Sequence, residues 1–143
     1  MAVHINHLAV WVAAAIYFVI GGLWYAPFLF GKQWIALNRM SDEARLANLK
    51  AKGGMIVFLG LSFVGGVISI YALACLLSAM SVTSISGGAL TGLTISWALY
   101  FIPTYISNLF AMRPFRLTLI DGGYVVLALT IAGAILPALT TSA

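Results

Sequence analysis

Four long apolar stretches constrain this chain more than any other feature. They run over residues 8–30, 55–80, 87–112 and 115–139. A helix needs about 20 mostly apolar residues to cross the hydrocarbon core of a bilayer, and each stretch is that long. Only 7% of the residues are charged, against about 25% in soluble domains. We therefore expect one all-α membrane domain over residues 1–143, a bundle of four transmembrane helices.

The placement of the basic residues predicts the orientation of the chain. All seven Lys and Arg lie in the first and third connections, residues 31–54 and 112–116. Basic connections stay in the cytoplasm, so both termini are expected on the outer side of the cell (inner) membrane. The net charge of +4 reflects this asymmetry and not a long basic face. We therefore expect the lipid bilayer, and no nucleic acid, as a partner.

The first connection, the cytoplasmic loop 31–54, has the pattern of a short amphipathic helix. Ser41 suits the N-cap, two acidic residues follow it, and Gly53 suits the end. Leu46 and Leu49 would then dip toward the membrane. The sequence fits a helix at the membrane face and a solvated connector equally well.

Asp121 is the only acidic residue within a predicted span. It lies about 9 Å into the fourth span, where an ionisable group is costly and often functional. Arg116 is not at a facing helical spacing, so Asp121 should point toward other helices. Residues at similar depth define a candidate polar cluster. Its members are Asp121, Asn108, Tyr25, Tyr105 and Lys32.

That candidate cluster has two interpretations. It is either a hydrogen-bonded group that locks helices together, or a site for a proton, an ion or another small ligand. The sequence leaves both open.

Small residues recur on two spans at helical spacing. The third span carries Gly88, Gly92 and Ser96, and the second carries Ser62 and Gly66. Small residues let membrane helices approach closely. Such packing can join helices of one chain or helices of two copies of the chain. We expect a homo-oligomer.

Two prolines, Pro27 and Pro103, lie inside predicted spans. Each removes one helix hydrogen bond and frees the carbonyl four residues earlier. We expect a kink at each proline, and a widened bundle at the cytoplasmic end.

Signals of catalysis are absent from the sequence. There is no nucleophile–base pair, phosphate loop or metal-ligand set. His4 and His7 have no carboxylate or cysteine nearby, and Cys75 is interpreted as a small buried hydrophobe. We expect no catalytic residue, metal or cofactor.

Several motifs resemble one bacterial family. They are GLWYAPFLFGKQW at 22–34, RPFRL at 113–117, LIDGGY at 119–124 and AGAIL at 132–136. The family is known only as domain of unknown function 1761 (DUF1761). The resemblance implies a small four-span membrane protein with no established activity. It also implies that asparagine often stands at the position of Asp121.

Three functions fit these observations. The first is a non-enzymatic protein that acts through self-assembly or partner binding, and it predicts a packed interior with Asp121 hydrogen-bonded. The second is a small transporter or channel, and it predicts a solvated cavity at Asp121 and Asn108. The third is a lipid-binding protein or membrane enzyme, and it predicts a lateral groove by Pro27 or Pro103. We expect the first.

Overall fold

The structure, a computed structural model, describes residues 5–141. All regular secondary structure within these residues is helical. The helices are α1 (His7–Trp24), α2 (Gly31–Leu37), α3 (Asp42–Ala51), α4 (Gly54–Ala79), α5 (Ile85–Ser96), η1 (Trp97–Phe101), α6 (Ile102–Phe110) and α7 (Phe115–Thr141). Segment η1 is a π-helical turn that joins α5 to α6 in one long helix. Four helices are long and apolar enough to span a membrane: α1, α4, α5–α6 and α7. The expected all-helical fold class is confirmed, with four helices long and apolar enough to span a membrane.

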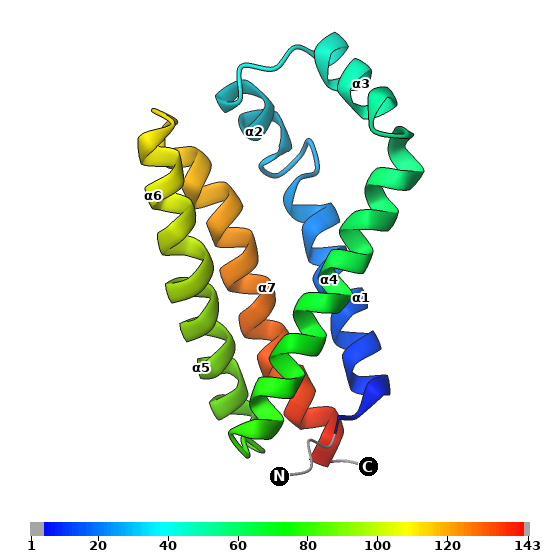
Figure 1. Ribbon diagram of the computed structural model, residues 1–143, viewed down its shortest axis with the longest axis vertical. Helices are drawn as coiled ribbons and strands as arrows, with labels where there is room; N and C mark the ends of the chain where they lie inside the picture. Colours follow the sequence, from blue (N-terminus) through cyan, green and yellow to red (C-terminus); the bar gives the residue numbers. More distant parts are fainter. Residues whose placement is uncertain (1–4, 142–143) are drawn as a thin grey trace.

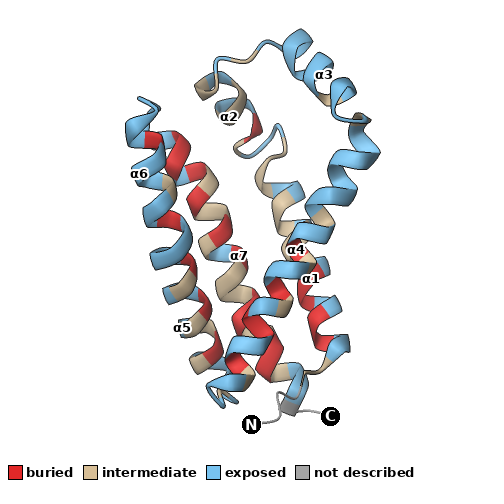
Figure 2. Ribbon diagram, in the orientation of Figure 1, coloured by how far each residue is buried: buried red, intermediate tan, exposed pale blue. Residues whose placement is uncertain are grey.

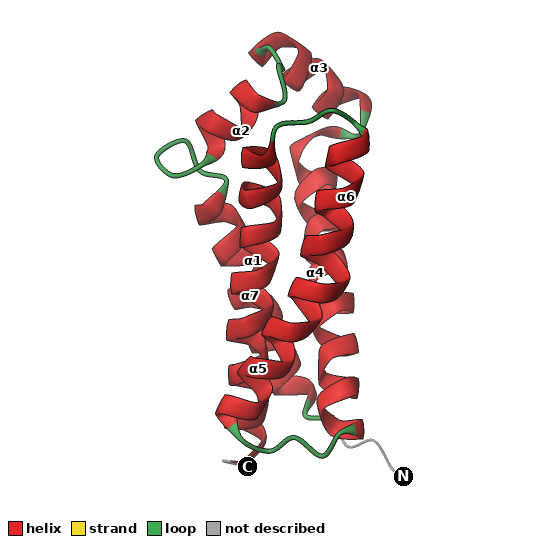
Figure 3. Cartoon of the chain, turned by 90° about the vertical axis from the view of Figure 1, so that its left-hand side faces the viewer, coloured by secondary structure: helices red, strands yellow, loops and turns green. Residues whose placement is uncertain are grey.

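The long helices run along one axis and place all the basic residues at one end (Figures 1 and 3). That end holds α2, α3 and the connection between α6 and α7. The start of α1, the end of α7 and the α4–α5 connection lie at the opposite end. The bundle is therefore polarised as the positive-inside rule requires, and the rule predicts that the basic end faces the cytoplasm.

Cysteine labelling tests this orientation. In a Cys75→Ser background, Lys50→Cys is expected to react with a membrane-impermeant maleimide only after the cells are opened. Ser84→Cys is the matched control. Ser84 lies in the α4–α5 connection at the opposite end of the bundle, and the new cysteine should react in intact cells. The reverse pattern would contradict the orientation.

The core forms where α1, α4 and α7 meet. Ala9, Val10, Ala13 and Ala14 of α1 are fully buried there, and Ile70 is the best-buried core residue of α4. Alanines present little bulk, so neighbouring helices approach α1 closely. Buried residues also line the contact between α5 and α7 (Figure 2).

Toward the basic end, α4 and α1 diverge (Figure 1). Gly66 is the last buried residue of α4 on this side, and it packs against the ring of Tyr17. Phe63 stacks on Trp11 and meets Phe18 edge-on. Beyond these rings, residues 55–62 of α4 are all exposed. The divergence therefore leaves space between two predicted spans.

The first span ends earlier than the sequence predicted. Helix α1 stops at Trp24, and Pro27 lies in a loop, so the expected kink at Pro27 is wrong. The residue before a proline avoids helical geometry, which ends the helix here. The amide of Phe30 donates to Trp24 O and that of Gly31 donates to Ala26 O, which closes a tight loop. Helix α2 follows this loop, and the sequence analysis did not predict it.

The third span contains Pro103 as predicted, at the start of α6. Pro103 has no amide hydrogen to donate. The wide π-helical turn η1 precedes it, and in this turn the Ile102 amide donates to Trp97 O, five residues earlier. The ring of Phe101 lies where a side chain on Gly122 would have to go. The helix therefore stays continuous and packs on α7.

Helix α3 begins with the cap that the sequence indicated. Ser41 Oγ accepts a hydrogen bond of 3.1 Å from the Ala44 amide. Leu46 is exposed, whereas Leu49 is half-buried and faces α4 and α1. The two leucines therefore do not share one environment.

The small residues of the third span pack inside the chain. A side chain on Gly88 would meet the Gly133 carbonyl, and one on Gly92 would meet the Leu129 carbonyl. Ser96 is buried and donates to Gly92 O at 2.7 Å. Of the second-span residues, Gly66 is buried, while Ser62 is exposed and donates to Phe58 O. The row on α5 thus serves contact with α7.

Two minor expectations have separate outcomes. Cys75 is exposed on α4, so its expected burial is wrong, because an apolar side chain needs no burial in protein when lipid surrounds it. His7 Nδ1 lies 2.8 Å from the Tyr71 hydroxyl. His4 lies outside the described residues.

Candidate functional site

Asp121 accepts two hydrogen bonds from segments far away in the sequence. The Tyr25 hydroxyl donates to Asp121 Oδ1 at 2.8 Å, and Trp34 Nε1 donates to the same oxygen at 2.9 Å. Tyr25 follows α1, Trp34 belongs to α2, and Asp121 lies on α7. We call these three residues the aspartate cluster. It ties three elements together at the basic end of the bundle.

A parallel contact fixes the turn of α7 that carries Asp121. Trp24 Nε1 donates to Ile120 O at 2.8 Å, and the Trp24 ring lies against Gly123, which has no side chain to obstruct it. A Cβ on Gly31 would collide with the carbonyls of Tyr25 and Ala26. The glycines are thus needed for close approach, and the loop after α1 is held against α7.

Tyr124 extends this contact to α1. Its ring lies 5.3 Å from that of Tyr17 and 5.7 Å from that of Tyr25. Its hydroxyl donates to Tyr17 O at 3.3 Å, beside Gly21. The motifs around residues 22–34 and 119–124 therefore form one contact surface.

The structure divides the candidate polar cluster of the sequence analysis. Tyr25 and Asp121 come together. Asn108 Nδ2 instead donates to Thr118 Oγ1 at 3.0 Å, and both residues are buried. Tyr105 is exposed and meets Phe115 edge-on.

Lys32 is exposed, and within residues 5–141 no ion pair joins it to Asp121. Trp34 is the member of the aspartate cluster that the sequence analysis did not single out, because a tryptophan near the end of a span is typical of an anchor at the membrane interface. The available signal was its position just after the Pro27–Gly31 loop, which turns the chain back toward the bundle.

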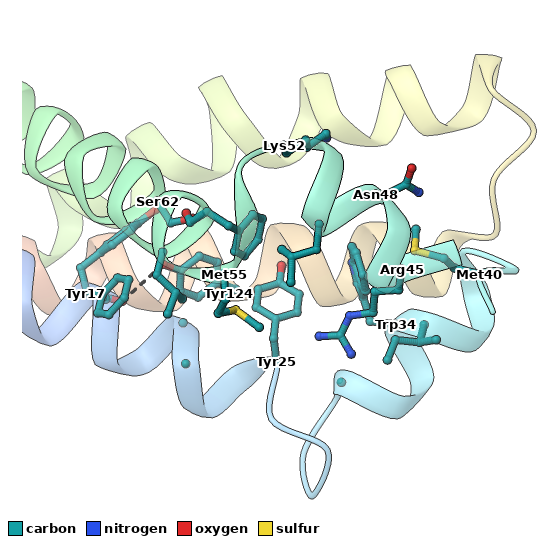
Figure 4. Close-up of a pocket in the computed structure, with 18 residues that line it drawn as sticks. Tyr17, Tyr25, Trp34, Met40, Arg45, Asn48, Lys52, Met55, Ser62 and Tyr124 are labelled. Atoms are coloured by element: carbon teal, nitrogen blue, oxygen red, sulfur yellow. Dashed lines mark hydrogen bonds between the residues drawn. The ribbon is translucent and has the colours of Figure 1, made fainter. Parts of the chain in front are cut away.

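A pocket of about 420 Å³ lies between α1, α2, α3 and α4 (Figure 4). This volume falls within the roughly 300–1,000 Å³ typical of ligand pockets. Helices α1 and α4 contribute mainly apolar and aromatic side chains to its walls. Helix α3 and its C-cap contribute the exposed polar side chains of Arg45, Asn48 and Lys52, which form the rim of the pocket. Principal lining residues are Tyr17, Phe18, Tyr25, Trp34, Arg45, Asn48, Leu49, Lys52, Met55, Phe58 and Leu59. We call this space the lateral pocket.

The aspartate cluster and the lateral pocket share a wall. Tyr25 and Trp34 line the pocket and also donate to Asp121. Asp121 itself does not line the pocket, and neither does Asn108. The carboxylate is therefore linked to the pocket through hydrogen bonds from these two aromatic side chains.

Comparisons with known proteins identify a family but no function. No curated protein and no solved structure matches the chain. A profile described as "Protein of unknown function (DUF1761)" matches residues 8–137. This match covers most of the chain, including both motifs that meet at the aspartate cluster, so the chain belongs to the DUF1761 family.

Proposed function

We propose that this chain is a non-enzymatic, multi-pass membrane protein that binds an acyl chain of a membrane lipid in the lateral pocket. The observation that carries the proposal is the position of that pocket between two predicted spans. Its walls include Phe18 of α1 and Met55, Phe58 and Leu59 of α4. These side chains suit a hydrocarbon ligand, since burial of each CH₂ group contributes about 0.8 kcal/mol when water is displaced.

The exposure of α4 supports entry from the bilayer. Residues 55–62 are exposed along their length, and four of them line the pocket. A lipid could enter between α1 and α4 without its tail crossing water. This geometry corresponds to the lateral groove expected of a lipid-binding protein, located beside the loop that contains Pro27.

The polar groups favour binding over catalysis or transport. Asp121 and Asn108 would be the key groups of an ion path, yet each bonds a neighbouring side chain and neither lines the pocket. Self-association stays part of the proposal. The α5 row is used within the chain, whereas Gly65 and Ser69, both exposed on α4, are small residues available for a contact between copies.

Photo-crosslinking tests the proposal. Protein in vesicles of phosphatidylcholine, doped with a phospholipid bearing a diazirine on its acyl chain, is irradiated and mapped by peptide mass spectrometry. Labelling is expected to favour Met55, Phe58 and Leu59 over Ile56 and Leu61, which are exposed but do not line the pocket.

A blocking variant provides the control. Gly22 lines the pocket, and a Cβ there would meet nothing within 4 Å, so Gly22→Phe should fill the space without a backbone clash. Gly60→Phe adds the same bulk at an exposed position of α4 where nothing lies within 4 Å and which does not line the lateral pocket. Gly22→Phe should lower labelling of the pocket residues severalfold, and Gly60→Phe should not. Equal labelling in both variants would refute the proposal.

A further inference from the structure

We infer that the lateral pocket selects a phospholipid with an acidic headgroup, and that Arg45 binds its phosphate. This inference rests on the proposed function, because it names the class of lipid that the same pocket takes.

The first supporting observation is the charge of the rim. Arg45 of α3 and Lys52, the C-cap of that helix, line the pocket, and none of its lining residues is acidic. Asp42 and Glu43, the other charged residues near the start of α3, are exposed and do not line it. The pocket therefore combines apolar walls with a positive mouth, which complements an anionic amphiphile.

The second observation is that Arg45 lacks a protein partner. No hydrogen bond or ion pair to its side chain occurs among residues 5–141. In Figure 4 its guanidinium group points toward the space between Tyr25 and Trp34. A guanidinium group offers paired donors that match phosphate oxygens. Arg45 is exposed at the pocket mouth, where its guanidinium group is free to donate two hydrogen bonds to a phosphate.

The third observation is the order of chemistry along the pocket. Its apolar part lies between α1 and α4, within predicted spans, whereas its cations lie on α3 and at the C-cap of α3, before α4 begins. A phospholipid in a bilayer has the same order, with the chain in the hydrocarbon and the phosphate at the interface. Tyr25 directly follows the α1 span and Trp34 lies in α2, outside the candidate spans, and aromatic side chains with a polar group are favoured at the membrane interface.

Lys52 has a smaller expected role than Arg45. Its ammonium group points away from Tyr25 and Trp34 in Figure 4. It would therefore add attraction for an acidic headgroup without a fixed contact. A cation near an anionic membrane surface contributes about 1 kcal/mol, which corresponds to about a fivefold change in affinity.

Native mass spectrometry of the delipidated full chain tests the inference, with phosphatidylglycerol and phosphatidylcholine as probes. We expect phosphatidylglycerol to bind about fivefold or more tightly than phosphatidylcholine. Arg45→Gln should remove most of that preference and Lys52→Gln less of it. Lys50→Gln makes the same charge change on α3 outside the pocket and should leave the preference intact. Arg45→Lys should retain part of it.

The outcomes separate this inference from the proposed function. If both lipids bind equally and Gly22→Phe abolishes both, the pocket binds lipid but does not select acidic headgroups, and the inference is overturned. If Lys50→Gln lowers the preference as much as Arg45→Gln, the attraction is diffuse and the role of Arg45 is refuted. If Gly22→Phe changes nothing, the proposed function itself fails. Stronger binding of oleate than of phosphatidylglycerol would identify a fatty acid in place of a phospholipid.

Discussion

Asp121→Leu is expected to destabilise the protein by about 2–3 kcal/mol, whereas Asp121→Asn should cost less than about 1 kcal/mol. Leucine removes the oxygen to which Tyr25 and Trp34 donate and leaves both donors in a half-buried place without their acceptor. Asparagine keeps a carbonyl oxygen of similar geometry. Thermal unfolding in detergent, followed by circular dichroism, measures the difference.

Two further readouts locate the effect. Trp34 fluorescence should shift in Asp121→Leu, because the indole loses its partner, and should change little in Asp121→Asn. Tyr25→Phe removes one of the two donors and should have an intermediate effect. If asparagine were as harmful as leucine, the negative charge would be what matters. That result would revive the interpretation of Asp121 as a cation or proton site.

Gly88→Val is expected to lower the stability of the protein by more than about 3 kcal/mol or to prevent folding. The first atom of the new side chain would occupy the space of the Gly133 carbonyl on α7. Backbone atoms cannot move aside as a flexible side chain can, so α5 and α7 would have to separate. The yield of folded protein in detergent and its unfolding temperature measure the loss.

Gly65→Val is the matched control for this prediction. It places the same side chain in another predicted span, but nothing lies within 4 Å of its Cβ. Any cost or benefit of valine in a membrane helix is shared by both variants, so their difference reports the α5–α7 contact. Similar stabilities would show that these helices are not as close as the structure places them. A change of oligomeric state in Gly65→Val alone would instead locate a contact between copies on α4.

The sequence alone determined the all-helical fold class and the four helices that are long and apolar enough to span a membrane. Length, hydrophobicity and the shortage of charge leave little alternative, because a backbone in lipid must satisfy its own hydrogen bonds within helices. The same local information predicted the Ser41 cap and the place of Pro103 in a span. It also predicted that Asp121 would point away from Arg116, which follows from helical spacing.

The partners of the polar residues depended on tertiary structure. Depth along a span placed Asn108 beside Asp121 in the sequence analysis, but depth does not specify which face of a helix a residue occupies. In the structure, Asn108 donates a hydrogen bond to Thr118, and Asp121 accepts hydrogen bonds from Tyr25 and Trp34. Trp34 reaches Asp121 because α1 ends at Trp24 and the chain folds back through a tight loop.

The lateral pocket likewise depended on tertiary structure. Hydropathy predicts that α1 and α4 exist, but not the angle at which they cross. That angle follows from side-chain shape, with alanines and Gly66 allowing contact near the core and the Phe63 contacts marking where it ends. Local sequence determines whether a segment crosses the membrane, because each helix satisfies its own backbone. The packing of several segments at once determines what lies between them, because it depends on shapes that no single segment contains.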